Sequence, residues 1–181
     1  MPNYPICNSL RIALAVFLAS SINAIVVPEL AHAQTPPMAA DIYENVIRVP
    51  VTASDLEGKH FAADIAVTTY KPAGNGPFPL VVISHGRAED PRERAAVPRY
   101  RFQSASRFFV RKGFVVAVPT RLGYGDTVGV GDPESRGDGC EKLNSSALLQ
   151  STTAEIKAVV ARMRQETYVD PQRLVLAGES V

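Results

Sequence analysis

Three short, uninterrupted apolar runs constrain the fold of this chain more than any other feature. They span residues 80–83 (LVVI), 114–118 (FVVAV) and 174–177 (LVLA). A strand with one face in water alternates apolar and polar residues, whereas a strand buried on both faces does not. The three runs therefore predict strands inside a largely parallel sheet.

Two segments with helical periodicity separate these runs. Residues 98–112 place apolar side chains on one face, and Gly113 follows in the position of a helix C-cap. Residues 147–163 have apolar residues at steps of three and four, which is typical of an amphipathic helix. The order strand, helix, strand, helix, strand predicts an α/β fold, with a mostly parallel sheet and helices on both faces. The first apolar face consists of Phe102, Ala105, Phe108 and Phe109.

Two further strands are expected upstream of the first run. They span residues 45–51 and 61–70 and are joined by turn residues at 54–59. A turn is also expected at residues 170–171 (DP), just before the third run. No internal repeat and no Ser/Gly-rich linker divides the chain, so residues 43–181 are expected to form one domain.

The first 33 residues are typical of a secretion signal. Arg11 precedes residues 12–27, which carry no charge, and residues 31–33 (AHA) give the small-x-small pattern of a cleavage site. Cleavage is expected before Gln34, followed by a flexible leader over residues 34–42. The protein is then exported to the periplasm or the medium. The alternative is an uncleaved membrane anchor, although a spanning helix needs roughly 20 apolar residues.

The composition of the full sequence limits the classes of partner that the protein can bind. Nineteen basic and eighteen acidic residues give a net charge of +1, which excludes a strongly basic nucleic-acid binder. No membrane partner is expected once the signal is removed. Cysteines of exported proteins tend to pair, and Cys7 leaves with the signal. Cys140 is then either paired with a cysteine outside this chain or a buried free thiol.

The third apolar run leads into a pattern that carries chemistry. Residues 178–181 are Gly-Glu-Ser-Val, and Gly-x-Ser after a buried strand matches most of the nucleophile elbow Gly-x-Ser-x-Gly. Small neighbours allow the sharp turn that exposes the serine hydroxyl, and the amide after the serine points at the developing oxyanion. The alternative is a glycine-rich turn in which Ser180 caps a helix.

With their flanking residues, the three runs resemble the first half of an α/β-hydrolase, of the secreted dienelactone-hydrolase-like or prolyl-oligopeptidase-like branch. The resemblance covers about residues 43–181. The segments that carry it are residues 79–86 (PLVVISHG), 113–127 (GFVVAVPTRLGYGDT) and 169–180 (VDPQRLVLAGES).

The resemblance implies a nucleophile and an oxyanion hole. Ser180 would be the nucleophile, and Gly178 would permit the elbow. The backbone amides of Val181 and Arg87 would form the oxyanion hole.

The resemblance also implies roles around the first strand. His85 and Gly86 would shape the oxyanion loop, and Tyr124 would lie near the mouth of the site as a pocket residue. In this fold the base follows the serine in the sequence. His85 precedes it and is expected to be structural, and His60, in a turn, is expected at the surface.

Several parts of the family pattern do not occur before residue 181. These are the triad acid and base, the last glycine of the elbow and the later strands. The chain is therefore interpreted as an amino-terminal fragment with little or no activity as written. Its last strand is expected at an open sheet edge without a covering helix, which favours aggregation.

The expected reaction is hydrolysis of a carboxylic ester or related acyl bond of a small molecule through an acyl-enzyme. No cofactor and no metal are expected. One alternative is a serine peptidase of the prolyl-oligopeptidase type. Another is a non-catalytic or vestigial protein on the same scaffold.

Two charged segments are interpreted as surface features. Residues 87–112 hold eight basic and three acidic residues, a net charge of +5. This segment could steer an anionic substrate, but a solvated loop and helix face is favoured. Residues 123–139, with Glu141 just beyond, could bind calcium, although their spacing does not fit an EF-hand loop. The acidic residues of this second segment are Asp126, Asp132, Glu134, Asp138 and Glu141.

Overall fold

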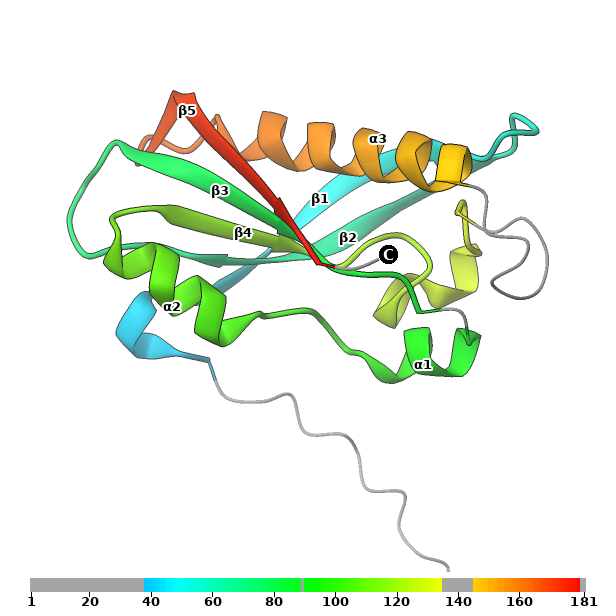
Figure 1. The fold of residues 1–181 in the computed structure, drawn as a ribbon, viewed down its shortest axis with the longest axis horizontal. Helices are drawn as coiled ribbons and strands as arrows, with labels where there is room; N and C mark the ends of the chain where they lie inside the picture. Colours follow the sequence, from blue (N-terminus) through cyan, green and yellow to red (C-terminus); the bar gives the residue numbers. More distant parts are fainter. Residues whose placement is uncertain (1–37, 89, 135–144, 180–181) are drawn as a thin grey trace, which may run out of the picture. The chain divides into compact units, whose positions relative to one another are not determined.

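The computed structural model of the chain describes residues 38–88, 90–134 and 145–179 (Figure 1). Several predictions fall outside these residues: the signal peptide and its cleavage site, residues 34–37 of the leader, both cysteines, Ser180 and Val181. The described part of the predicted flexible leader, residues 38–42, contains a 3-10 helix at Ala40–Ile42 and the buried side chains of Ala39 and Ile42. No helix in the described part of the chain is long and apolar enough to cross a bilayer.

The described residues form a five-stranded mixed sheet with the order β1-β2-β4-β3-β5. β1 pairs antiparallel with β2, and β2 with β4, whereas β3 lies parallel to both β4 and β5. The predicted α/β class is confirmed. The turn at residues 54–59 joins β1 and β2 in a hairpin, and β2 then pairs antiparallel with β4 as well. The strands are β1 (Asn45–Ser54), β2 (His60–Tyr70), β3 (Phe78–Ser84), β4 (Val115–Pro119) and β5 (Val169–Gly178).

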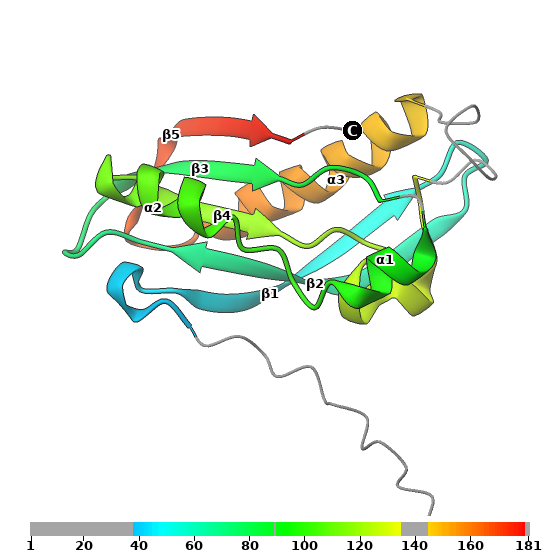
Figure 2. The same cartoon turned by 60° about the horizontal axis from the view of Figure 1, so that its bottom comes forward.

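Helices cover both faces of this sheet, as expected. α3 lies on one face and α2 on the other, with α1 beyond the carboxyl end of β3 (Figure 2). The α-helices are α1 (Pro91–Ala96), α2 (Gln103–Arg111) and α3 (Ser145–Met163), and two short 3-10 helices span Ala40–Ile42 and Gly125–Val130.

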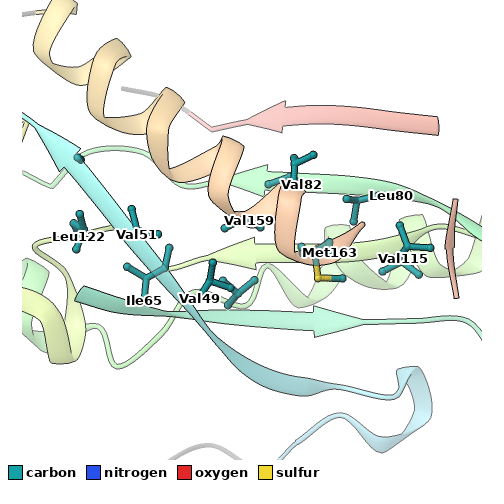
Figure 3. Close-up of a cluster of buried hydrophobic side chains, with 14 of the residues drawn as sticks. Val49, Val51, Ile65, Leu80, Val82, Val115, Leu122, Val159 and Met163 are labelled. Carbon is teal, nitrogen blue, oxygen red and sulfur yellow. The ribbon is translucent and has the colours of Figure 1, made fainter. Parts of the chain in front are cut away.

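The run LVVI of β3 is buried because its side chains fill two cores. Leu80 and Val82 pack on the α3 face, where Met163 also lies (Figure 3). Val81 and Ile83 pack on the α2 face. Since successive side chains of a strand point to opposite faces, a strand between two helical layers needs an apolar residue at every position.

The predicted helix over residues 98–112 is shorter in the structure. α2 begins at Gln103, because sheet side chains bind the backbone just before it. The hydroxyls of Thr68 and Tyr70 donate to the carbonyls of Tyr100 and Arg101 at 2.8 and 2.9 Å. Phe108, predicted on the buried face, is 57% exposed. Gly113 follows the helix with a φ of 85°, as the predicted C-cap requires.

β5 is a strand parallel to β3, as predicted, but it is not buried. Its apolar residues at positions 174, 175 and 176 are 37%, 40% and 57% exposed. The reason is its place at the edge, where β3 is its one neighbour within the described sheet. The strand begins at Val169, and the turn predicted at residues 170–171 falls in an irregular stretch of its pairing with β3.

Candidate active site at the carboxyl edge of the sheet

The three parallel strands end at one edge of the sheet, and the described ones among the predicted site residues lie at or next to this edge. Ser84 of β3 pairs with Gly178 of β5, and the Glu179 amide donates to the Ser84 carbonyl at 3.0 Å. Gly178 is exposed and has nothing within 4 Å of the position of a Cβ. Ser180 and Val181 follow directly in the sequence and lie outside the described residues, so their predicted roles stay predictions.

His85 is buried with both ring nitrogens bound to backbone groups. Nδ1 lies 2.7 Å from the Gly86 carbonyl, and Nε2 lies 3.1 Å from the Arg121 amide. A carbonyl can only accept and an amide N–H only donate. The ring is therefore the neutral tautomer protonated on Nδ1. Burial and the nearby Arg121 guanidinium lower the pKa of His85 to about 3.

Aromatic rings enclose the His85 imidazole. The Tyr100 ring stacks on it with centroids 3.7 Å apart, and the Tyr124 ring meets it edge-on at 4.5 Å. Since the ring is wedged between them and bound at both nitrogens, its orientation is fixed.

The Gly86–Arg87 peptide is held by its carbonyl. The Gly86 oxygen accepts from His85 Nδ1 and from Nη2 of Arg121, the latter at 3.2 Å. This peptide is trans, so the Arg87 N–H points away from those donors. Among the described residues no group accepts from the Arg87 N–H. The next amide, of Ala88, donates to the Tyr124 hydroxyl at 2.8 Å.

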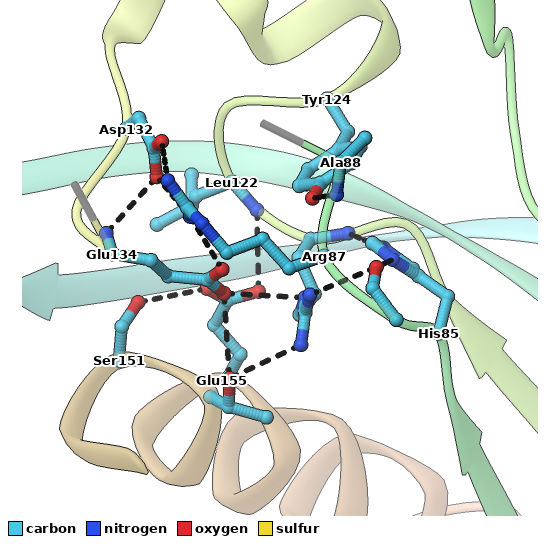
Figure 4. Close-up of polar contacts among 12 residues, drawn as sticks. His85, Arg87, Ala88, Leu122, Tyr124, Asp132, Glu134, Ser151 and Glu155 are labelled. Atoms are coloured by element: carbon cyan, nitrogen blue, oxygen red, sulfur yellow. Dashed lines mark hydrogen bonds and ion pairs between the residues drawn. The ribbon is translucent and has the colours of Figure 1, made fainter. Parts of the chain in front are cut away.

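Tyr124 was predicted near the mouth of the site. The structure places it fully buried, with its hydroxyl on the Ala88 amide (Figure 4). The Arg94 and Arg121 guanidinium groups lie over its ring at 6.0 and 5.8 Å from the centroid. A contact of Tyr124 with substrate stays a prediction, and its observed hydrogen bond is with the Ala88 amide in the loop after β3.

The Arg87 side chain belongs to a buried ionic network (Figure 4). Its guanidinium donates to both carboxylate oxygens of Asp132, at 2.8 and 3.3 Å, and to Glu134 at 3.0 Å. Burial lowers the pKa of Arg87, but these hydrogen bonds and charges outweigh it and raise the pKa above its usual value. Arg94 donates to the Ala88 carbonyl and lies 3.5 Å from Asp132.

This network corrects the interpretation of residues 87–112 as a solvated basic face. The side chains of Arg87, Arg94 and Arg99 are 9%, 8% and 6% exposed and paired with carboxylates. Arg92, at 93%, does face the solvent. Together with Arg101, four of the eight basic side chains of this segment are therefore paired with carboxylates inside the protein.

Ion pairs also explain why the described acidic residues after Gly123 lie where they do. Asp132 and Glu134 bind arginines, and Asp126 pairs with Arg48 at the surface. Asp138 and Glu141 lie outside the described residues. Within residues 38–88, 90–134 and 145–179, no group of three His, Cys, Asp or Glu side chains is arranged to hold a metal ion.

Glu155 of α3 lies beneath this network with almost no solvent contact. Its carboxyl group accepts from the Leu122 amide at 3.2 Å and contacts the Ser151 hydroxyl at 3.1 Å. Burial and the neighbouring Glu134 raise the pKa of Glu155 to about 8. Burial also raises the pKa of Glu134. Glu155 is therefore largely protonated at neutral pH.

A shallow apolar hollow of about 300 Å³ lies between α3 and β5 beside this edge. Leu148, Leu149, Ile156, Leu176 and Glu179 are among the residues that line it. His60, expected at the surface, is exposed and contacts the Ser54 hydroxyl in the β1–β2 hairpin.

Sequence reasoning missed the charged groups around residues 85–88 and the buried acid of α3 beneath them. Arg121 occurred only as part of a matching segment, Glu134 only as an acid among several, and Glu155 as a polar position of a helix. The spacing contains no signal for their contacts, since Glu134 is 47 residues from Arg87. The one available hint was Glu155 itself, since an acid on the predicted apolar face of residues 147–163 indicates a buried partner.

No family model matches the chain, and no curated protein matches it. Solved structures do resemble it. An acetyl xylan esterase from Paenibacillus sp. R4 is 14% identical with a TM-score of 0.45, over 76% of this chain and 46% of its own. A protein from Klebsiella pneumoniae assigned as a dienelactone hydrolase is 16% identical with a TM-score of 0.43, over 74% of this chain and 50% of its own.

A protein from Legionella pneumophila assigned as a hydrolase is 18% identical with a TM-score of 0.48, over 75% of this chain and 34% of its own. The chain spans half or less of the length of these three proteins. At such identities and TM-scores the likeness says nothing about which reaction this chain supports.

Proposed function

We propose that the chain carries the nucleophile and the oxyanion hole of a serine hydrolase of the α/β-hydrolase superfamily, of the secreted dienelactone-hydrolase-like or prolyl-oligopeptidase-like branch. The observation that carries the proposal is the Gly86–Arg87 peptide. Its carbonyl is bound by His85 and Arg121, and its N–H has no partner among the described residues. A fixed, unpaired N–H at the end of a buried strand is what an oxyanion hole requires.

In the proposed reaction the Ser180 hydroxyl oxygen attacks the carbonyl carbon of a carboxylic ester or related acyl group. A base takes the hydroxyl proton, and the amides of Arg87 and Val181 donate to the oxyanion of the tetrahedral intermediate. Collapse releases the alcohol, which takes up the proton, and leaves an acyl-enzyme. Water then attacks the acyl-enzyme, frees the acid and restores Ser180.

The base is not among the described histidines. His85 is neutral with its Nε2 lone pair bound by the Arg121 amide, so it cannot accept the Ser180 proton. His60 lies in the β1–β2 hairpin. We propose that the base and the triad acid follow the nucleophile in sequence, as the resemblance implies, and that residues 1–181 alone have little activity.

A fluorophosphonate probe tests the nucleophile. The protein is isolated from its source organism and labelled in parallel with the 181-residue chain. The probe is expected on the tryptic peptide that begins at Leu174 and contains Ser180, with no labelling after Ser180→Ala. The 181-residue chain is expected to react at least about 1,000-fold more slowly, because it lacks the base. A folded source protein that resists the probe, or one that still reacts after Ser180→Ala, contradicts the proposal.

Ester and peptide substrates separate the two enzymatic alternatives. We expect the source protein to hydrolyse p-nitrophenyl acetate faster than a prolyl p-nitroanilide. The reverse order would favour the peptidase alternative, and a folded protein inert toward both would favour the non-catalytic one.

Export is proposed from residues 1–33. Amino-terminal sequencing of the protein recovered from the periplasm or medium is expected to begin at Gln34. A protein that keeps residues 1–33 and fractionates with the membrane would support the anchor alternative.

A further inference from the structure

One buried carboxylate contacts two arginines of the Gly86–Arg87 region: Arg87 itself and Arg121, which binds the Gly86 carbonyl. Glu134 has a fully buried side chain; its Oε2 accepts from Arg87 Nη1 at 3.0 Å, and its Oε1 lies 3.2 Å from Arg121 Nε. We propose that Glu134 is a positioning residue that fixes the direction of the Arg87 N–H. This inference rests on the proposed function, in which that N–H is an oxyanion donor.

Arg121 is the first link between Glu134 and the peptide. Its guanidinium donates to the Gly86 carbonyl, and its own backbone amide donates to His85 Nε2. His85 Nδ1 then donates to the same carbonyl. Both donors that hold the Gly86 oxygen are therefore set by Arg121, one directly and one through the imidazole.

Glu134 in turn holds the Arg121 guanidinium in place. The Glu134–Arg121 contact is an ion pair without hydrogen-bond geometry at Nε. The Thr152 hydroxyl bridges the two groups, at 3.3 Å from Arg121 Nη1 and 3.3 Å from Glu134 Oε1. A neutral group at position 134 would keep the shape of the site but lose the charge that attracts the guanidinium.

Arg87 is the second link. Its side chain is anchored to Glu134 and Asp132, while its backbone N–H belongs to the peptide whose carbonyl Arg121 holds. The peptide is thus held at the Gly86 oxygen and at the Arg87 side chain, and one carboxylate connects the two anchors. A rotation of the peptide plane, which would turn the N–H away from an oxyanion, must break one of them.

Asp132 and Glu155 do not make the same connection. Asp132 contacts Arg87 and Arg94, and Glu155 binds the Leu122 amide and Ser151. Within the described residues, neither has a contact with Arg121 of the kind that Glu134 makes. Glu155→Gln is therefore the control: it makes the same substitution in an equally buried side chain, but it removes little charge, because Glu155 is largely protonated.

The structural test uses the isotopically labelled 181-residue chain. Glu134→Gln is compared with Glu155→Gln by nuclear magnetic resonance of the His85 ring nitrogens and the Arg87 amide. In Glu134→Gln the exchange of the His85 Nδ1 proton with water is expected to quicken about tenfold or more, since opening of its bond to Gly86 becomes easier. The Arg87 amide resonance is expected to shift with it. Glu155→Gln is expected to change neither.

The kinetic test uses the active protein from the source organism. Loss of one oxyanion donor costs roughly 100- to 1,000-fold in kcat. Misdirection of the Arg87 N–H in Glu134→Gln is expected to lower kcat roughly 10- to 100-fold and to leave KM within about twofold. Glu155→Gln is expected to keep both constants within about twofold.

Arg121→Lys keeps the inference testable if Glu134→Gln does not fold. A lysine ammonium keeps the charge but cannot reach Glu134 and the Gly86 carbonyl as a planar guanidinium does, so the same resonance changes are expected. A folded Glu134→Gln or Arg121→Lys whose His85 and Arg87 signals match the wild type overturns the positioning role. A wild type without activity contradicts the proposed function alone, and the resonance comparison still decides the role of Glu134.

Discussion

Two buried clusters of charged residues in this protein shift the pKa of a glutamate in opposite directions. The Glu44 cluster consists of Glu44, Arg99 and Arg101, just before β1. The carboxyl-edge cluster lies where the parallel strands end. It consists of Arg87, Arg94, Arg121, Asp132, Glu134 and Glu155.

The pKa values of the two glutamates show the contrast. Burial raises the pKa of Glu44, but hydrogen bonds from Arg101, the Ala39 amide and Arg99 outweigh it and lower the pKa to about 2. Burial raises the pKa of Glu155 to about 8, and the negative charge of Glu134 adds to the shift. Glu44 is therefore ionised at neutral pH, whereas Glu155 is largely protonated.

The difference lies in the neighbours rather than in burial itself. Glu44 receives hydrogen bonds from two arginines. Glu155 is bound by a neutral amide and a hydroxyl and lies beside another carboxyl group. A buried acid stays charged only where paired donors replace the water that it loses.

Removal of the Glu44 carboxylate is expected to have the largest effect on stability. Glu44→Gln leaves two buried guanidinium groups without their counter-charge, which costs about 3–5 kcal/mol in the free energy of unfolding at pH 7. Urea titration measures the loss. Glu93→Gln, at an exposed position of α1, is the control and is expected to change stability by less than about 0.5 kcal/mol.

The acid dependence of the wild type sharpens this prediction. The folded-state pKa of Glu44 lies below its unfolded value of 4.5, so its contribution is present above pH 4.5 and is lost as the pH falls toward 2. That part of the acid destabilisation, about 3 kcal/mol, should vanish in Glu44→Gln. If Glu44→Gln loses as much stability as the wild type between pH 4.5 and pH 2, the pairing of Glu44 with Arg99 and Arg101 is contradicted.

The carboxyl-edge cluster is expected to respond in the opposite direction. The carboxyl group of Glu155 loses its proton near pH 4.5 in the unfolded state but only near pH 8 in the folded state. Between these two values the folded state holds a proton that the unfolded state has already lost. Its contribution to stability therefore falls as the pH rises through that window. Glu155→Gln cannot ionise, and at pH 8.5 it should be more stable than the wild type by about 1–3 kcal/mol.

Unfolding of both proteins at pH 5.5 and pH 8.5 measures this difference. The gain of Glu155→Gln over the wild type should shrink or reverse at pH 5.5, where both side chains are neutral. A gain that does not depend on pH would show that the wild-type carboxyl group is already charged at neutral pH.

Loss of a neutral hydrogen bond at the carboxyl edge should change the free energy of unfolding less than the substitutions of Glu44 and Glu155. Tyr124→Phe removes the hydroxyl that accepts from the Ala88 amide and leaves that N–H unpaired, at a cost of about 1–2 kcal/mol. Thermal unfolding measures the loss. Tyr43→Phe, at a position 52% exposed, is the control and should be close to neutral.

An exposed ion pair gives the lower limit of the comparison. Arg48 and Asp126 pair with side chains 54% and 47% exposed. Arg48→Ala is expected to cost less than about 0.5 kcal/mol, because water screens exposed charges, and the small difference should disappear at 1 M salt. A loss as large as that of Glu44→Gln would mean that burial does not separate the clusters from the surface pairs.

Much of the fold follows from local sequence patterns. The unbroken run of β3, the amphipathic pattern of α3 and the C-cap glycine after α2 were predicted and are present. Each depends on the residue's own neighbours in sequence and on one buried face. The start of α2 was not predicted, because it depends on hydroxyl groups of β2, 31 and 32 residues away.

The candidate site divides in the same way. The sequence placed His85, Gly86 and Arg87 at the end of a buried strand, which is where the structure has them. It did not predict that Arg87 is buried or that Glu134 binds it, since a charged residue in a loop is usually solvated. The last strand was expected at an open edge, but its apolar run was still predicted as buried, because an apolar run has the same composition at an edge as at the centre of a sheet.

The sequence by itself determined the α/β class, the alternation of strands and helices, and the order of the segments at the carboxyl edge. These depend on periodicity and on steric rules that act over a few residues. Only the tertiary structure decided which charges pair, which glutamate keeps its proton and that the Arg87 N–H has no partner among the residues that the structure describes. Those properties depend on distances between residues far apart in the chain and on how much water the packing excludes.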